Sequence, residues 1–287
     1  SVVTEQKRNI MKPDLRVLSL GAGVQSSALA LMIEKGEIPM VDCAIFADTG
    51  AEPEKVYEWL EYIKSQVSYP VHVVQWRNLK EDLYAAAKGE YKGFTAPFHT
   101  RNRETGKKGI LMRQCTHDYK IMPVIRKIRE LLGLKKGQKV KPGTRVEQIM
   151  GISWDEIQRQ KINRLPYITN IYPLIETQMR RHNCINWMER NGYPKPPRSA
   201  CTFCPFRSNM EWKAIKENPK EWQEVLEIDE MIRDQEKFKK NKDGSKKFND
   251  DLFLHASAKP LKDVDLRSAE EKGQYSLLDE CEGMCGI

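Results

Sequence analysis

The feature that most constrains the fold is an apolar run, a glycine turn and an apolar helical segment in direct succession, LRVLSLGAGVQSSALALM (15–32). A short apolar run that ends at glycine is typical of a buried strand. An apolar run followed by a helical segment recurs twice. VDCAIFAD (41–48) precedes an amphipathic segment with Pro53 in its first turn, and VHVVQW (71–76) precedes a helix near 78–88. Strands that alternate with helices predict an α/β fold with a parallel sheet.

The rest of the chain is expected to be mainly loops and helices. We predict a loop over 89–112, a long helix over about 117–133 and one further strand over 146–153. From 176 onward the sequence predicts helices and no strand.

The composition is that of a soluble protein, with 40% hydrophobic and 31% charged residues. No run reaches the ~18 apolar residues of a membrane span, and the first residues lack a secretory signal. We therefore expect a cytoplasmic protein that does not bind a membrane. The seven cysteines are an odd number, which argues against a disulfide framework. In a reducing compartment, clustered cysteines favour metal or redox chemistry.

The formal net charge of +8 favours a polyanionic partner. Lysines are concentrated in KKGQKVK (135–141) and KFKKNKDGSKK (237–247). Each run is either a solvated loop or a contact for a nucleic-acid backbone. On the second interpretation we expect the runs to lie beside the active site.

The turn GAGVQSS (21–27) has the chemistry of a phosphate cradle. Gly21 and Gly23 allow backbone amides to approach an anion, and the helix that follows directs its N-terminal N–H groups to the same place. Ser26 and Ser27 add hydroxyl donors. The turn has neither the GKS or GKT ending of a P-loop nor the third glycine of a dinucleotide-binding loop.

GAGVQS (21–26) resembles the SGGxDS PP-loop of the adenine nucleotide alpha-hydrolase superfamily, with Gly21 in place of the first serine and Gln25 in place of the aspartate. Further stretches are similar, in the same order, to motifs of the phosphoadenylyl-sulfate (PAPS) reductase branch: FADTGAE (46–52), RQCTHDYKIMPV (113–124), GISWDE (151–156), IYPL (171–174) and CTFCPF (201–206). This resemblance covers roughly 15–210. It implies a parallel PP-loop (HUP-like) sheet flanked by helices, followed by a mainly helical part that carries a metal cluster.

The resemblance also implies a role for three cysteines. In iron–sulfur members of the superfamily, a cysteine of the RxC segment and a later CxxC pair hold one [4Fe–4S] cluster. The resemblance places these ligands at Cys115, Cys201 and Cys204 of this chain. Soft thiolates suit iron–sulfur clusters or zinc, so a zinc knuckle and unmetallated thiols remain alternatives. The arginines nearby would offset the thiolate charge: Arg113, Arg198 and Arg207.

The last residues, DECEGMCGI, contain two imperfect copies of the ECG motif of PAPS and adenylyl-sulfate reductases. Three interpretations of this tail are open. Cys281 or Cys285 acts as a catalytic nucleophile, or Cys285 is the fourth cluster ligand. In the third interpretation the tail is disordered. Cys43 and Cys184 are expected to be core thiols.

The resemblance and the position of these residues at strand ends imply the following nucleotide contacts: Gly21, Ala22, Gly23, Gln25, Ser26, Ser27, Asp48, Thr49, Gly50 and Gly151. Lys120 and Arg113 are candidate catalytic residues for holding phosphates or a leaving group. His117 either does the same or caps its helix. Asp155 and Glu156 either bind Mg²⁺ or lie on a solvated turn. Trp76 and Trp154 are expected to pack rather than to stack on bases.

The leading hypothesis is an ATP-dependent adenylylating enzyme of the PP-loop type that releases pyrophosphate and transfers sulfur to a nucleic acid (tRNA or DNA) or a nucleotide, with a donor such as a cysteine desulfurase. The first alternative is a reductase of PAPS or adenylyl sulfate. The second is a nucleic-acid-binding protein with a structural cluster. The expected parts are a flexible lead (1–14), a PP-loop nucleotide-binding domain (15–175) and a helical cluster-binding part with the cysteine-bearing tail (176–287). The oligomeric state is left open.

Overall fold

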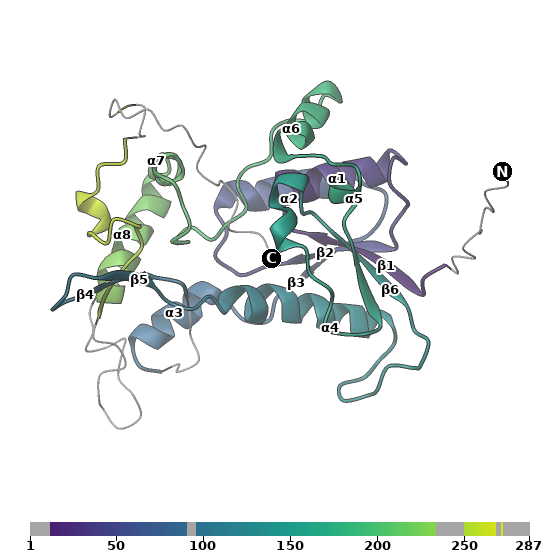
Figure 1. The fold of residues 1–287 in the computed structure, drawn as a ribbon, viewed down its shortest axis with the longest axis horizontal. Coiled ribbons are helices and arrows are strands. Elements are labelled where there is room, and N and C mark those ends of the chain that lie inside the picture. Colours follow the sequence, from purple (N-terminus) through teal and green to yellow (C-terminus); the bar gives the residue numbers. More distant parts are fainter. Residues whose placement is uncertain (1–11, 91–95, 234–249, 268–270, 272–287) are drawn as a thin grey trace, which may run out of the picture.

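The computed structural model describes residues 12–90, 96–233, 250–267 and 271. At its centre is a five-stranded sheet in the order β3-β2-β1-β6-β7, in which every neighbouring pair is parallel. The strands are β1 (Leu15–Leu20), β2 (Cys43–Ala47), β3 (Val71–Val74), β6 (Val146–Met150) and β7 (Ile168–Ile171). The prediction of an α/β fold with a parallel sheet flanked by helices is therefore confirmed (Figure 1).

Helices cover both faces of this sheet (Figure 1). They are α1 (Val24–Glu34), α2 (Glu54–Gln66) and α6 (Arg181–Arg190) on one face and α4 (Met122–Leu131) on the other. The side chains of β1 alternate between the two layers, as the pleat of a strand requires. Leu18 and Leu20 belong to the core under α1 and α2, whereas Val17 packs with Val124 and Ile128 of α4.

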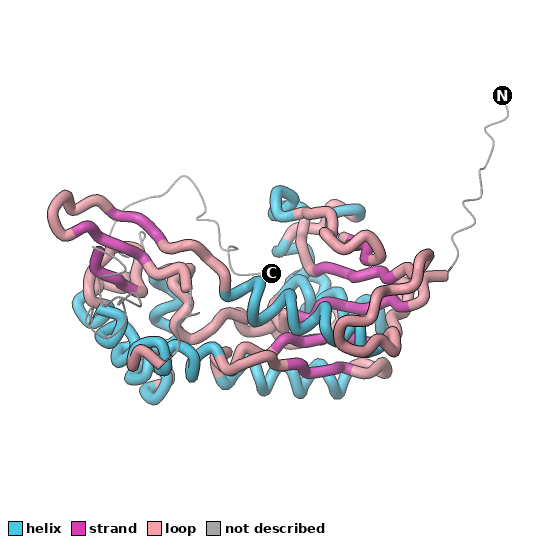
Figure 2. Tube along the Cα trace, turned by 90° about the horizontal axis from the view of Figure 1, so that it is seen from below, coloured by secondary structure: helices cyan, strands magenta, loops and turns pink. Residues whose placement is uncertain are grey.

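A second, smaller unit stands beside the carboxyl edge of the sheet (Figures 1 and 2). Its antiparallel sheet has the order β5-β4-β8, and its helices enclose a core around the buried Trp212. Its elements are β4 (His99–Asn102), β5 (Lys108–Ile110), β8 (Asp250–Phe253), α3 (Leu79–Ala87), α7 (Asn209–Lys216), α8 (Pro219–Arg233) and the short 3-10 helix η3 (Leu261–Asp263).

These strands correct two predictions. The segment 89–112 contains β4 and β5 rather than only a loop, and β8 is a strand beyond 176. All three strands are short and rich in polar residues. They are stable because β4 lies between two partners, one of which, β8, comes from about 150 residues later in the chain. The boundary at 175/176 stays a prediction, although β8 joins a strand from the other side of it.

The remaining helices are short: the π-helical turn η1 (His117–Ile121), the 3-10 helix η2 (Trp154–Arg159) and α5 (Pro173–Glu176). Together η1 and α4 form the single long helix that was predicted over 117–133. Within the ranges described above, no helix is long and apolar enough to cross a membrane.

The lysine run 135–141 does not lie where it was expected. It belongs to the connection between the end of α4 and the start of β6, and Arg145 in that connection bonds to Asp14, just before β1. The run therefore lies at the amino edge of the parallel sheet, opposite the carboxyl edge. The second run, 237–247, falls outside the described residues.

One buried carboxylate ties the second unit together. Asp229 on α8 accepts hydrogen bonds from the backbone N–H groups of Leu254 (3.1 Å) and Leu261 (2.8 Å), and it pairs with Arg233. Its side chain is 1% exposed. A buried charge is stable only with such partners, so Asp229 anchors the segment after β8 to α8.

We predict that Asp229→Ala lowers the free energy of unfolding by about 2–4 kcal/mol, because it leaves a cation and two buried amides without their acceptor. Urea denaturation measures the effect. Asp229→Asn, which keeps an acceptor, should cost less, and Ala at the exposed neighbour Glu230 should cost little. Equal effects of Asp229→Ala and Glu230→Ala would contradict the assignment.

Candidate functional site

Loops from three neighbouring strands meet at the carboxyl edge of the sheet. Gly21 follows β1, Asp48 follows β2 and Gly151 follows β6. Gly151 lies directly against the first turn of α1, because a Cβ atom at this position would be 2.8 Å from the backbone nitrogen of Ser26. The structure therefore brings together three of the predicted nucleotide-binding segments, at the edge where open α/β sheets bind ligands.

The glycine turn (21–23) is closed by a serine. The hydroxyl of Ser26 accepts a hydrogen bond from the N–H of Gly21 (3.1 Å) and donates one to the carbonyl of Gly23 (3.4 Å). Between the glycines, the buried Ala22 has a positive φ of 55°, a strained conformation for a residue with a side chain.

Helix α1 begins after this turn without a capping side chain and without an acidic residue in its first turn. Helix termini leave their first amide groups without intrahelical partners, and the dipole adds positive potential there. The glycine turn and this helix end therefore suit an anion such as a phosphate.

The hydroxyl of Ser27 faces the interior instead. Ser27 is fully buried and accepts a hydrogen bond of 2.9 Å from the indole N–H of Trp59 on α2. This bond joins α1 to α2.

A polar network lies on the other side of the glycine turn. The amide of Gln25 donates to the carboxylate of Glu156 (3.3 Å) and to the hydroxyl of Ser153 (3.4 Å). Arg159 donates to the second oxygen of Glu156 (2.7 Å). Burial raises the pKa of Glu156, and the charge of Arg159 opposes that rise. Asp155, in contrast, accepts from the backbone N–H of Arg181 at the start of α6.

The segment after β2 is fixed by its own side chains. Asp48 accepts hydrogen bonds from the N–H of Gly50 (2.7 Å) and the hydroxyl of Tyr57 (2.8 Å). Gly50 has φ +70°, and a Cβ atom there would collide with the side chain of Asn78. Thr49 contacts Cys201, with 3.5 Å between Oγ1 and Sγ. The loop that carries Asp48 thus touches the CxxC loop.

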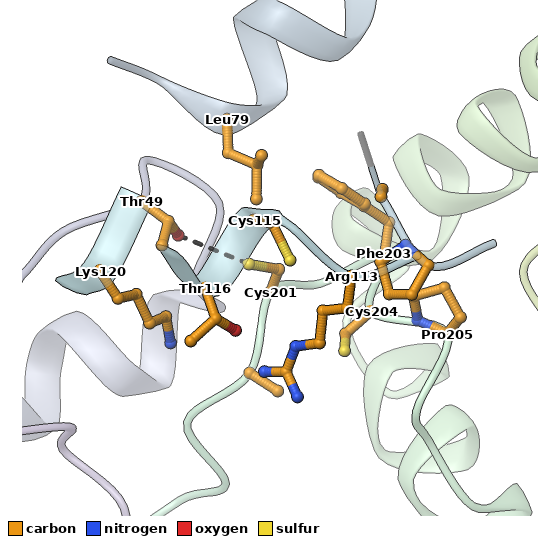
Figure 3. Close-up of a pocket in the computed structure, with 13 residues that line it drawn as sticks. Thr49, Leu79, Arg113, Cys115, Thr116, Lys120, Cys201, Phe203, Cys204 and Pro205 are labelled. Carbon is orange, nitrogen blue, oxygen red and sulfur yellow. Dashed lines mark hydrogen bonds between the residues drawn. The ribbon is translucent and has the colours of Figure 1, made fainter. Parts of the chain in front are cut away.

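All three cysteines that were predicted to share a cluster line one cavity (Figure 3). Cys115 comes from the segment before η1, and Cys201 and Cys204 come from the loop before α7. Arg113 and Lys120 also line this cavity, which we call the thiol cavity. Sequence positions 115 and 201 are far apart, so the fold itself brings these thiols together.

Arginines hold the CxxC loop in shape. Arg207 is buried and donates to the carbonyls of Ala200 and Cys201, both at 2.8 Å. Arg198 donates to the carbonyl of Phe206 (2.6 Å) and pairs with Glu211, and the guanidinium of Arg113 lies 5.4 Å from the Phe206 ring centre. Arg198 and Arg207 therefore stabilise the backbone of the CxxC loop, and their effect on the thiolate charge stays a prediction.

Burial, together with the charge of Glu52, raises the pKa of the Cys201 thiol to about 12, although Lys120 and Thr49 act to lower it. Without a metal, Cys201 is thus a neutral thiol near pH 7. Thiols that bind a metal lose this proton. A metal ion or cluster at this position would therefore take the place of the thiol proton, and its positive charge would balance the buried thiolate.

Glu52 links the two halves of the site and was not singled out from the sequence. Its carboxylate is 1% exposed and lies 3.2 Å from the ammonium of Lys120. Its other oxygen lies 3.5 Å from the hydroxyl of Ser199. Ser199 is also the side chain nearest to Gly23, where an added Cβ would be 3.8 Å away. The thiol cavity and the glycine turn are thus joined through one carboxylate.

The structure also places the remaining candidate residues named from the sequence. Cys43 and Cys184 are buried, as predicted. His117 is exposed and contacts Asp118 (2.7 Å) rather than capping η1. Trp76 is partly exposed and contacts Tyr119, whereas Trp154 packs beside Met150. Cys281 and Cys285 fall outside the described residues.

The three cysteines line the thiol cavity but do not form a site for a single metal ion. Within 12–90, 96–233 and 250–267, no group of three or more His, Cys, Asp or Glu side chains is placed to hold a single metal ion. A cubane cluster binds each thiolate through a different iron, so its ligands surround a volume. The donor set of three thiols fits such a cluster in its chemistry.

Comparisons with known proteins add little to this geometry. No family model matches the chain, and no curated protein matches it. Among solved structures, the chain is similar to the crystal structure of phosphoadenylyl-sulfate (PAPS) reductase from Candida auris in complex with phosphate, with 14% sequence identity and a TM-score of 0.40 over 65% of this chain and 77% of that chain. A TM-score this low supports no statement about family membership or function.

Proposed function

We propose that this protein is an ATP-dependent adenylylating enzyme with a [4Fe–4S] cluster, which activates a nucleic acid or nucleotide for sulfur transfer. The observation that carries the proposal is the contact between the glycine turn and the thiol cavity through Glu52, Ser199 and Lys120. An anion site beside three soft thiol ligands suits chemistry that combines a phosphate leaving group with sulfur.

The chain's own groups would act at the α-phosphate of ATP. The N-terminal amides of α1 and the glycine turn would bind the phosphates, and Asp48 and Thr49 would lie near the nucleoside. An acceptor oxygen would attack the α-phosphorus, and the bond to pyrophosphate would break. Lys120 has the charge to stabilise that leaving group, and Glu52 holds its ammonium in place. Mg²⁺, if it is carried by the nucleotide, would meet oxygen ligands near Gln25 and Glu156.

The cluster would be held by Cys115, Cys201 and Cys204, with Cys285 as the proposed fourth ligand. A [4Fe–4S] centre supplies an electron store, or an open iron for a sulfur atom when the fourth ligand is absent.

Reduction of PAPS or adenylyl sulfate by Cys281 or Cys285 is the second candidate function. Pyrophosphate exchange into ATP distinguishes the two, because only an adenylylating enzyme catalyses it, whereas the reductase releases sulfite from PAPS.

We predict that Ser26→Ala weakens ATP binding by about 1–2 kcal/mol, or roughly 5–30-fold, because the hydroxyl that closes the glycine turn is lost. Isothermal titration calorimetry measures the change. Ser65→Ala is a matched control, since this exposed serine bonds only within α2. A wild-type protein without affinity for any adenine nucleotide would refute the proposed function.

We also predict that anaerobically purified protein contains about four irons and four sulfides per chain. Ala at Cys115, Cys201 or Cys204 should remove the brown absorbance and most of the iron. Ala at the core thiols Cys43 and Cys184 is the control, because these changes affect packing but should leave iron per folded chain unchanged. Stoichiometric zinc without iron would support the zinc alternative instead.

A further inference from the structure

The β4–β5 hairpin projects from the second unit (Figures 1 and 2). Its outer strand, β5, is an edge of the small sheet, and all residues from Arg103 to Ile110 are exposed. The chain then continues through Arg113 to Cys115, both in the cavity wall. A large substrate that reached the cavity would therefore meet this hairpin.

The hairpin carries an excess of positive charge. Within 99–110 there are four basic residues and one acidic residue, Glu104. Arg101 and Lys108 stand directly opposite each other on β4 and β5, an arrangement that costs stability between like charges. On the other side of β4, Asp251 of β8 faces Arg101 and pairs with Arg103.

The ammonium groups of Lys107 and Lys108 form no ion pair with any residue that the structure describes. Both lysines are exposed, and an anion between the strands would relieve the repulsion of Lys108 and Arg101. The charge pattern thus fits a polyanionic partner.

The turn of the hairpin is held by side-chain hydrogen bonds, and apolar side chains follow it. The side-chain oxygen of Asn102 accepts hydrogen bonds from the N–H groups of Glu104 (3.1 Å) and Thr105 (2.9 Å), which fixes the turn. Ile110, on the same strand face as Lys108, is 47% exposed, and Met112 is 74% exposed. Cations followed by apolar side chains suit a chain of phosphates with unstacked bases, since bases have apolar faces.

We propose that the β4–β5 hairpin and the segment up to Cys115 bind the backbone of a single-stranded nucleic acid and direct one of its bases toward the site that the thiol cavity and the glycine turn form together. This proposal rests on the proposed function, and it names the substrate as single-stranded. A base within a duplex cannot enter a cavity unless it leaves the stack. Lys107 and Lys108 contact phosphates, and Ile110 and Met112 contact the base faces.

Fluorescence anisotropy tests this with the full chain and labelled single-stranded DNA and RNA, together with the corresponding duplexes. The test variant is Lys107→Ser with Lys108→Ser. The matched control is Lys135→Ser with Lys136→Ser, which removes the same charge at the opposite edge of the central sheet. The test variant should bind single strands about tenfold more weakly at low salt. Its slope of log K against log salt should flatten by about 1.4, from two lost phosphate contacts at roughly 0.7 each.

The control variant should bind within about twofold of the wild type, and Met112→Ala should weaken binding without changing the salt slope. Equal weakening by both double variants would mean that only net charge matters, and would overturn the proposal. So would tighter binding of duplexes, equal competition by polyglutamate, or a dimer in light scattering that the Lys108 change disrupts.

Calorimetry with ATP distinguishes a failure of the hairpin proposal from a failure of the proposed function. If ATP binds but the hairpin variant binds nucleic acid normally, only the hairpin proposal fails. If ATP does not bind, both fail.

Discussion

A buried carboxylate is the constraint on which the candidate site depends. Glu52 is almost completely removed from solvent, and its partners are Lys120 and Ser199. A carboxylate in such a place is tolerated only while it is paired and hydrogen-bonded. The segment after β2, the helical turn before α4 and the approach to the CxxC loop must therefore stay together. Because Ser199 also faces Gly23, this arrangement fixes the thiol cavity relative to the glycine turn.

The positions of the phosphate-binding elements follow from strand direction. All five strands of the central sheet run the same way, so Gly21, Asp48 and Gly151 emerge at one edge. The close approach of Gly151 to Ser26 leaves no space for a side chain. The second unit then covers part of this edge and supplies Cys201 and Cys204. The site is thus formed between the parallel sheet and the smaller unit, and both are needed to complete it.

The sequence predicted β1, β2, β3 and β6 of the central sheet and the glycine turn, because apolar strands and amphipathic helices have strong local patterns, but it did not predict the edge strand β7. It did not predict β4, β5 and β8, since residues such as Arg101 and Lys108 give no apolar alternation and their partner strand is distant in the chain. Glu52 and Ser199 were missed because burial of a single polar residue has no local signal. The predicted position of the lysine run 135–141, beside the active site, was wrong for another reason. In a parallel sheet, the connection from a helix to the next strand lies at the amino edge. That rule was applicable to the sequence and would have corrected the expectation.

The central claim is that nucleotide and thiol-bound cluster share one active site. Electron paramagnetic resonance of the anaerobic protein, reduced with dithionite, tests it directly when spectra are recorded with and without saturating ATP. The account predicts a [4Fe–4S]⁺ signal whose g values or line widths change on addition of ATP, because the phosphates bind on the other side of Glu52 and Lys120 from the cluster. A signal that ATP leaves unchanged, in a protein shown by calorimetry to bind it, would contradict a shared site.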